Sequence, residues 1–459
     1  MHTEMRFRKR LLSMAMVIVL LVSLVVGFAP QPTAAQMTMP MDGLVCTMGS
    51  GDMMSPTFTL TTQRGYILTP DTNSVYMWGF SEGSNPYQYP GPVLCVQEGA
   101  MVTVVLNNTL PQPVSIVFPG QDQVMADGAL AQPQFDALGT LTSLTNAAPT
   151  GSSVTYSFTA THPGTFIYES GTNQGIQVPM GLFGALIVRP MDGEFFVYDD
   201  ALMPQTSEFN HGWTDQMGNI ISGEFLVLQS EVDPLLSQAV ERWAEQGQPF
   251  NFNMNNYHPR YWFLNGRGFP DTLAPNFASW LPSQPYGALA HIVPNVETPG
   301  DPQLLHYLER FANVSSQILP FHPHGRNALV IGRDAQPVRG PAGQDLSGET
   351  FALTAAPGQT YDALFHYHDL EGYNSATNPI PVTDPGWQNL TYGMFYGGSP
   401  YLGETGPLVP GSTPMNECGE YYIIAHNHAL FQLTSWGVVM TGPGTFLRID
   451  PPGGCPAMQ

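Results

Sequence analysis

The chain has 459 residues, of which 43% are apolar and only 11% are charged, and its formal net charge is −22 at pH 7. Because Lys9 is the only lysine and acidic residues far outnumber basic ones, these numbers exclude a basic patch for nucleic acid or anionic lipid. The 47 glycines and 43 prolines favour short strands joined by turns, so the composition predicts an all-β protein with two or three domains.

The first 35 residues have the order of a secretory signal. Arg6 to Arg10 is basic, an apolar run extends from Leu11 to Phe28, and the small residues Thr33 to Ala35 follow. We expect residues 1–35 to be cleaved, so that the protein is secreted or otherwise extracytoplasmic, in a periplasm or at a cell surface. The alternative is an uncleaved signal anchor, because the apolar run is nearly long enough to span a bilayer.

Residues 36–55 form a leader rich in methionine and glycine. It contains Met37, Met39, Met41, Met48, Met53 and Met54. Thioether sulfur favours Cu(I), but a flexible leader that binds nothing explains the same composition.

Residues 56–192 are predicted to form a first β domain. Residues 102–106, 153–158 and 184–188 are short alternating or apolar runs bounded by turn residues, which indicates strands. Residues 193–221, which contain several glycines and the acidic pair Asp199 and Asp200, are predicted to be a linker.

Residues 222–453 are predicted to form a second β domain. Its strand-like runs are residues 224–229, 261–264, 328–331, 361–365, 421–424 and 445–450. Residues 234–247 have helical spacing and end at a glycine, which predicts one helix. The stretches 272–305 and 370–418 are long loops, and loops of that length tend to be functional or disordered.

The four cysteines lie near the ends of the chain that remains after residue 35. They are Cys46, Cys95, Cys418 and Cys455. In an oxidising compartment they predict two disulfides. We expect Cys46–Cys95 and Cys418–Cys455, although the spacing leaves three connectivities open.

Two histidine doublets stand out in the second domain. They are His322 with His324, and His426 with His428. Residues i and i+2 of a strand point to the same face, so each doublet presents two imidazoles side by side. If the two strands pair, four neutral imidazoles meet on one wall, which is a ligand set for copper, zinc or iron.

The motifs around these segments resemble those of the multicopper oxidases, laccase-like proteins built from cupredoxin domains. In the first domain the matching stretches are 90–99, 102–113, 162–168 and 177–188; in the second they are 261–271 and 357–362. The resemblance covers most of the chain after residue 35. It implies two cupredoxin-like Greek-key β-sandwich domains, with long loop insertions in the second.

The same resemblance implies that most of the family's copper ligands are absent. Its four first-domain histidines fall within Val117 to Gly120 and Glu169 to Gly171, where this chain has no histidine. The two histidines and the cysteine of its mononuclear blue copper centre fall on Leu319, Asn427 and Gln432. Without the thiolate, a blue copper electron-transfer site is not expected.

Four cluster histidines remain, so copper is the cofactor that the resemblance implies, held by His322, His324, His426 and His428. The predicted function is copper binding with incomplete oxidoreductase activity, for which the electron donor is unknown. One alternative is a non-catalytic envelope or extracellular scaffold in which the imidazoles only form hydrogen bonds. Another is a homo-oligomer whose neighbouring copy supplies further ligands.

The other candidate side chains are given structural roles. Glu169 stands at a former ligand position, where it either faces a metal or, as we expect, is solvated or paired with arginine. His366 and His368 form another i, i+2 pair outside the family's motifs, and we assign them to the surface. Five histidines stand alone in the sequence and are predicted to be structural: His162, His211, His258, His291 and His306.

Overall fold

The computed structural model describes residues 42–191, 197–198, 213–214, 220–221, 223–292, 306–324, 327–366, 421–435, 437–438 and 440–449. All of them belong to one compact unit, Pro40–Gln459. Within these ranges, no helix has the length and apolar character needed to cross a bilayer. The predicted signal, most of the predicted linker, the loop 370–418, Cys418 and Cys455 lie outside the described residues.

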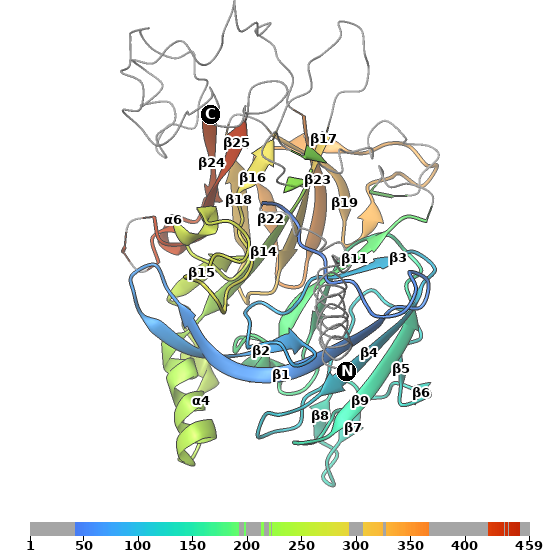
Figure 1. The fold of residues 1–459 in the computed structure, drawn as a ribbon, viewed down its shortest axis with the longest axis vertical. Helices are drawn as coiled ribbons and strands as arrows, with labels where there is room; N and C mark the ends of the chain where they lie inside the picture. Colours follow the sequence, from blue (N-terminus) through green and yellow to red (C-terminus); the bar gives the residue numbers. More distant parts are fainter. Residues whose placement is uncertain are drawn as a thin grey trace, which may run out of the picture. The chain divides into compact units, whose positions relative to one another are not determined.

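The first sandwich is formed by a six-stranded sheet, in the order β2-β1-β4-β9-β5-β6, and a three-stranded sheet, β10-β11-β3 (Figure 1). Their strands are β1 Thr57–Leu68, β2 Ser74–Glu82, β3 Leu94–Gln97, β4 Met101–Asn107, β5 Met125–Ala126, β6 Ala129–Leu130, β9 Ser153–Thr159, β10 Gly164–Glu169 and β11 Phe183–Arg189. A separate hairpin joins β7 Gln134–Phe135 to β8 Leu141–Ser143, and α2 spans Gln174–Gln177. Along β4, Val102, Val104 and Leu106 are buried at every second position, as a half-buried strand requires. The strands predicted at 102–106, 153–158 and 184–188 are confirmed.

The second sandwich pairs a seven-stranded sheet, β15-β14-β17-β23-β19-β20 with β21 on β19, and a five-stranded sheet, β16-β25-β24-β18-β22. Their strands are β14 Glu224–Val232, β15 Tyr261–Leu264, β16 Ala290–Ile292, β17 His306–Asn313, β18 Leu319–Pro323, β19 Ala328–Arg333, β20 Gln336–Pro337, β21 Gly348–Thr350, β22 Leu353–Ala355, β23 Thr360–His366, β24 Tyr421–Asn427 and β25 Gly444–Ile449. Short elements complete the described chain: β12 Trp213–Thr214, β13 Ile220–Ile221, η1 Met254–Asn256, η2 Asp271–Leu273 and α6 Leu430–Leu433. Phe311, Phe321 and Ala425 lie in the apolar core between the two sheets. All six strands predicted in the second domain are confirmed.

The predicted helix is α4, Pro234–Gln246, and its ends follow from its sequence. The Asp233 carboxylate accepts a hydrogen bond from the N–H of Leu235, and Gly247 closes the helix at φ 66°. The helix packs on the first sandwich, where the rings of Trp243 and Trp78 lie 6.4 Å apart between centroids. A segment that follows the first strand of the second domain therefore covers the first domain and ties the two together.

The first described residues are packed against the first sandwich. Cys46 forms a disulfide with Cys95 of β3, which confirms one of the two predicted disulfides. Leu44 and Val45 are buried, and the N–H of Thr47 donates to the carbonyl of Val93. From residue 42 onward, the segment predicted as a leader is therefore held in place rather than free.

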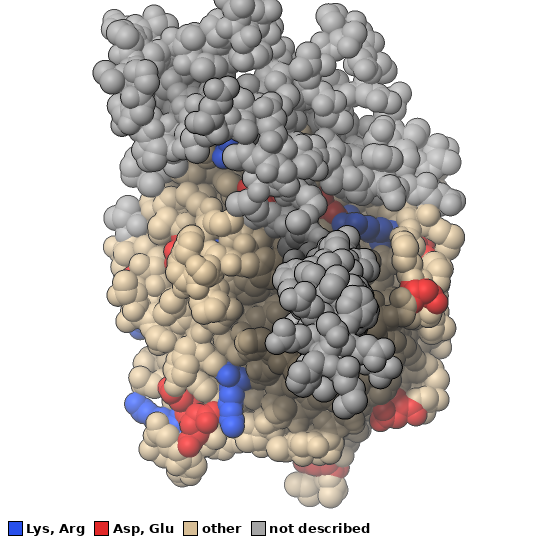
Figure 2. All heavy atoms as spheres, in the orientation of Figure 1, with Lys and Arg blue, Asp and Glu red and all other residues tan. Residues whose placement is uncertain are grey.

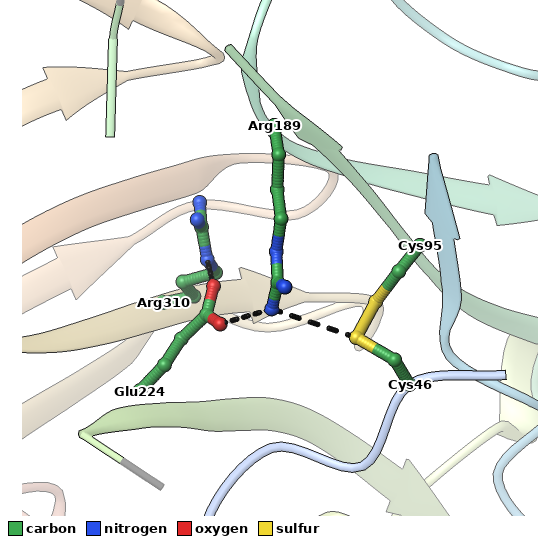
Figure 3. Close-up of a disulfide and its surroundings, with 5 residues drawn as sticks. All are labelled: Cys46, Cys95, Arg189, Glu224 and Arg310. Atoms are coloured by element: carbon green, nitrogen blue, oxygen red, sulfur yellow. Dashed lines mark hydrogen bonds and ion pairs between the residues drawn. A yellow bond between two sulfur atoms is a disulfide. The ribbon is translucent and has the colours of Figure 1, made fainter. Parts of the chain in front are cut away.

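A buried ion network joins the two sandwiches (Figure 3). The Arg310 guanidinium of β17 donates to Glu224 of β14 and, at 3.0 Å, to Asp362 of β23. Glu224 also accepts from Arg189 of β11, and Arg310 donates to Thr165 of β10. Because β10 and β11 belong to the first sandwich, the network crosses the boundary between domains. Elsewhere charge is sparse, and most of the visible described surface in Figure 2 is neither acidic nor basic.

Candidate metal centre

The two histidine doublets lie on neighbouring antiparallel strands. His322 of β18 is directly paired with His426 of β24, and Phe321 is paired with Asn427. Phe321 points into the apolar core of the second sandwich, so His322 projects from the opposite face of the sheet. The strand pairing therefore produces the convergence that the i, i+2 spacing predicts.

The four imidazoles form a contiguous group, which we call the histidine wall: His322, His324, His426 and His428. The centroid of the His322 ring lies 4.6 Å from that of His324, 6.0 Å from that of His426 and 5.4 Å from that of His428. The Nε2 atoms of His324 and His426 are 3.0 Å apart. The predicted convergence is thus confirmed, while the role of these rings as ligands stays a prediction.

Two rings of the histidine wall are oriented by backbone carbonyls. His322 Nδ1 donates to the carbonyl of Phe351 at 2.5 Å, and His426 Nδ1 donates to the carbonyl of Asn427 at 2.9 Å. A carbonyl only accepts, so the proton sits on Nδ1 and Nε2 is the nitrogen that carries a lone pair. Ligating histidines are usually held in this way by their second nitrogen.

Burial keeps these imidazoles neutral. It is the largest influence that lowers the pKa of His322 and of His426, and the neighbouring imidazoles lower both further. The carbonyl hydrogen bonds of Phe351 and Asn427 oppose this shift but do not reverse it. A neutral imidazole is the form that binds a metal ion.

Phe351 covers part of the histidine wall. Its ring stacks on that of His322 at 3.8 Å between centroids and 23° between planes, and lies 5.6 Å from that of His428. The Phe351 side chain is nevertheless 58% exposed. It lies between β21 and β22, and no sequence motif points to it. Only the folded arrangement assigns it to the site.

The three positions that the sequence resemblance assigns to blue copper ligands are filled by a leucine and two amides, all of which are buried. Asn427 Nδ2 donates to Gln432 Oε1 at 2.6 Å, and Gln432 Nε2 donates to Gln317 Oε1 at 2.9 Å. Leu319, Asn427 and Gln432 are all buried. Trp262 Nε1 also donates to Gln317, at 3.2 Å. This closed network of amides offers no thiolate or imidazole, so a blue copper ion does not fit here.

The former ligand positions of the first domain also lie together. Val117 and Glu169 form a bridge in which each backbone N–H donates to the other residue's carbonyl. A Cβ on Gly171 would lie 2.7 Å from Val117 Cγ1, so this position adjoins them. The pairing of Val117 with Glu169 parallels that of His322 with His426, which supports the correspondence drawn from the sequence. None of these side chains is an imidazole.

Glu169, which was expected to be solvated or paired with arginine, is half-buried. Its carboxylate accepts a hydrogen bond from Gln174 Nε2 at 3.1 Å, and no arginine of the described ranges pairs with it. Burial raises the pKa of the Glu169 carboxyl. Gln174 belongs to α2, a short helix that the sequence patterns did not predict.

Outside the histidine wall, His291 Nδ1 lies 3.2 Å from a carboxylate oxygen of Asp42, which agrees with a structural role. His211 and His368 lie outside the described residues. Within the ranges that are described, no three His, Cys, Asp or Glu side chains are placed closely enough to enclose an ion. The four rings lie close together, but their arrangement is not that of a closed coordination shell.

Comparison with known proteins identifies the fold. Residues 68–193 match the multicopper oxidase family model. The probable nitrite reductase-hydroxylamine oxidoreductase fusion protein of Kuenenia stuttgartiensis is 30% identical over 155 residues, which make up 31% of this chain and 17% of that protein. The chain thus spans less than a fifth of the length of this curated relative.

Two solved structures are similar over most of their length. The blue copper oxidase from Nitrosomonas europaea has a TM-score of 0.51 and 17% identity, with 86% of each chain covered. The multicopper oxidase mgLAC has a TM-score of 0.50 and 19% identity, with 87% of each chain covered. Residues 68–193 therefore match the multicopper oxidase family model, and the described chain shares the cupredoxin β-sandwich fold of the two solved oxidases.

Proposed function

We propose that this protein is an extracytoplasmic, multicopper-oxidase-like protein that binds copper through His322, His324, His426 and His428. The observation that carries the proposal is the orientation of His322 and His426, whose Nδ1–H groups are held by backbone carbonyls so that Nε2 is the unprotonated nitrogen. Neutral imidazoles are a suitable donor set for copper. Copper bound there would supply one-electron redox chemistry.

The protein is not a complete laccase under this proposal. The amide network of Asn427, Gln432 and Gln317 leaves no place for the blue copper ion that would accept electrons. Val117 and Glu169 offer no imidazole from the first domain. A substrate or a partner protein would therefore deliver electrons directly to the histidine wall, and the identity of that donor is open.

A specific contact favours the alternative, a scaffold that has lost its metal. His324 and His426 satisfy each other through their Nε2 atoms at 3.0 Å. Since His426 carries its proton on Nδ1, His324 would donate from Nε2, and the pair would then need no ion. The two functions differ in one measurable property, which is copper content.

The test is metal analysis of the protein purified from its native compartment, together with the double variant His426→Ala/His428→Ala. We expect copper in the wild-type protein and its loss in the double variant, with an unchanged fold measured by circular dichroism. The control is His162→Ala, because His162 is exposed and lies in the first domain. Copper-free wild-type protein that also takes up no added copper would support the scaffold instead.

We also propose a homo-oligomer in which the first domain of one copy lies over the histidine wall of another. Each region carries a strongly exposed apolar side chain: Leu138, in the turn between β7 and β8, is 92% exposed, and Phe431, three residues after His428, is 60% exposed. Light scattering of the purified protein should give a mass above that of one chain, and Leu138→Asp should shift it towards the monomer.

A further inference from the structure

Five methionines of the described ranges are strongly exposed, and Met54, Met101 and Met191 among them lie around Gly99 in the first sandwich. The five are Met48, Met53, Met54, Met101 and Met191, with exposed fractions between 42% and 65%. Methionine is usually a buried residue, so a group of exposed ones calls for an explanation. Three different parts of the chain contribute to it: the first described segment, the start of β4 and the residues after β11.

The thioether ends of Met54 and Met191 approach the same point. A Cβ placed on Gly99 would lie 3.5 Å from Met54 Cε and 3.0 Å from Met191 Cε. Gly99 has φ +78°, a conformation that favours glycine, so the space above it is left to the two methionines. Met101 follows two residues later, and its N–H donates to the Met54 carbonyl at 2.8 Å.

The backbone that presents these side chains is fixed. The Cys46–Cys95 disulfide fastens the first described segment to β3 (Figure 3). The N–H of Thr103 donates to the carbonyl of Pro56, and the N–H of Glu98 donates to the carbonyl of Arg189, two residues before Met191. The methionines therefore stay close together although their side chains face solvent.

We propose that Met54, Met101 and Met191 form a Cu(I) site on the surface of the first domain, separate from the histidine wall. Thioether sulfur is a soft ligand that selects Cu(I) over harder metal ions. The unbranched methionine side chain adapts its rotamers easily, so three exposed thioethers on a fixed backbone can close around one ion. The carboxylate of Asp52, which accepts from the Met54 N–H at 2.9 Å, adds negative charge nearby that attracts a cation.

This site does not depend on the function proposed for the histidine wall. Leucine would serve equally well on an apolar docking surface, whereas only methionine supplies sulfur. The substitution of leucine for methionine therefore separates the two roles, because it keeps the volume and apolar character and removes the ligand atom.

The experiment is an anaerobic competition for Cu(I) between the full-length protein and bicinchoninate. The wild-type protein and His426→Ala/His428→Ala should both withdraw Cu(I) from the chelator. Met54→Leu/Met191→Leu should bind Cu(I) at least about tenfold more weakly. The matched control is Met125→Leu/Met254→Leu, which changes two methionines on β5 and η1 and should bind as the wild type does.

Equal Cu(I) affinity in the wild type and in Met54→Leu/Met191→Leu would overturn the proposal, and so would an equal loss in the control variant.

A second measurement needs no substitution. Silver(I), a soft ion without the redox chemistry of copper, should shift the ε-methyl NMR signals of Met54, Met101 and Met191 and leave that of the buried Met180 in place. Shifts confined to other methionines would also overturn it.

Discussion

The side-chain amide of Asn427 donates a hydrogen bond of 2.6 Å to Gln432 inside the second sandwich, at two of the positions where the sequence resemblance predicts lost blue copper ligands. Both residues are buried, and Gln432 Nε2 in turn donates to Gln317 Oε1 at 2.9 Å. Two matched amides satisfy each other's donors and acceptors without a metal ion. The site has thus become a structural polar network.

The first prediction concerns the absorption spectrum. Because Asn427 supplies an amide where a thiolate is required, the copper-loaded protein should lack the intense blue band of thiolate–copper charge transfer. Visible absorption of the protein titrated with Cu(II) should show only weak imidazole-type bands. An intense blue band would show that a thiolate binds Cu(II) in this protein. The prediction drawn from Asn427 would then be wrong.

The second prediction concerns turnover. The sequence resemblance places Val117 and Glu169, which form a backbone bridge, at first-domain histidine positions of the family, so we expect a three-copper cluster to lack half of its ligands. The copper-loaded protein should therefore show no sustained oxygen consumption with phenols, measured with an oxygen electrode. A complete laccase under the same conditions serves as the positive control. Robust turnover would contradict the proposal of an incomplete oxidase.

The third prediction concerns the buried ion network. Arg310→Ala leaves the carboxylates of Glu224 and Asp362 buried without this cation, and should lower the free energy of unfolding by about 3–5 kcal/mol. Arg333→Ala is the matched control, because the exposed Arg333 lies 3.8 Å from Asp334 and should cost about 1 kcal/mol or less. Urea unfolding measures both values. Similar small losses would show that the network does not stabilise the domain boundary.

The fourth prediction is a dependence of stability on pH. Burial raises the pKa of Glu309 from 4.5 to about 8. Below pH 4.5 the carboxyl is protonated in both the folded and the unfolded chain, so it has no effect. As pH rises from 4.5 towards 8, the Glu309 carboxyl ionises only in the unfolded chain. The free energy of unfolding of the wild type therefore falls, by about a few kcal/mol.

The measurement compares Glu309→Gln with the wild type in urea between pH 4 and pH 9. The variant cannot ionise here, so its stability relative to the wild type should increase over this interval. Glu349→Gln, at an exposed position of β21, controls for the general effect of removing a charge. A difference that stays constant with pH would show that Glu309 does not titrate as its burial implies.

Local sequence was sufficient for the strands and the long helix that it predicted, although it missed the short helix α2 and several short strands. The alternation of Val102, Val104 and Leu106 gave β4 its buried face, and Asp233 and Gly247 marked the two ends of α4. The histidine doublets followed from the same periodicity, because i and i+2 share a face on any strand. These features depend on residues that are close in the sequence, so they can be predicted from the sequence alone.

Tertiary structure alone decided what surrounds those residues. Phe351 stacks on His322 from 29 positions away, and Gln317 meets Gln432 across 115 positions. Glu169 was expected to be solvated or paired with arginine and is instead half-buried beside Gln174, because α2 folds back over the end of β10. Such contacts depend on which strands become neighbours in a sheet, and strand pairing is set by the packing of the whole sandwich rather than by local pattern.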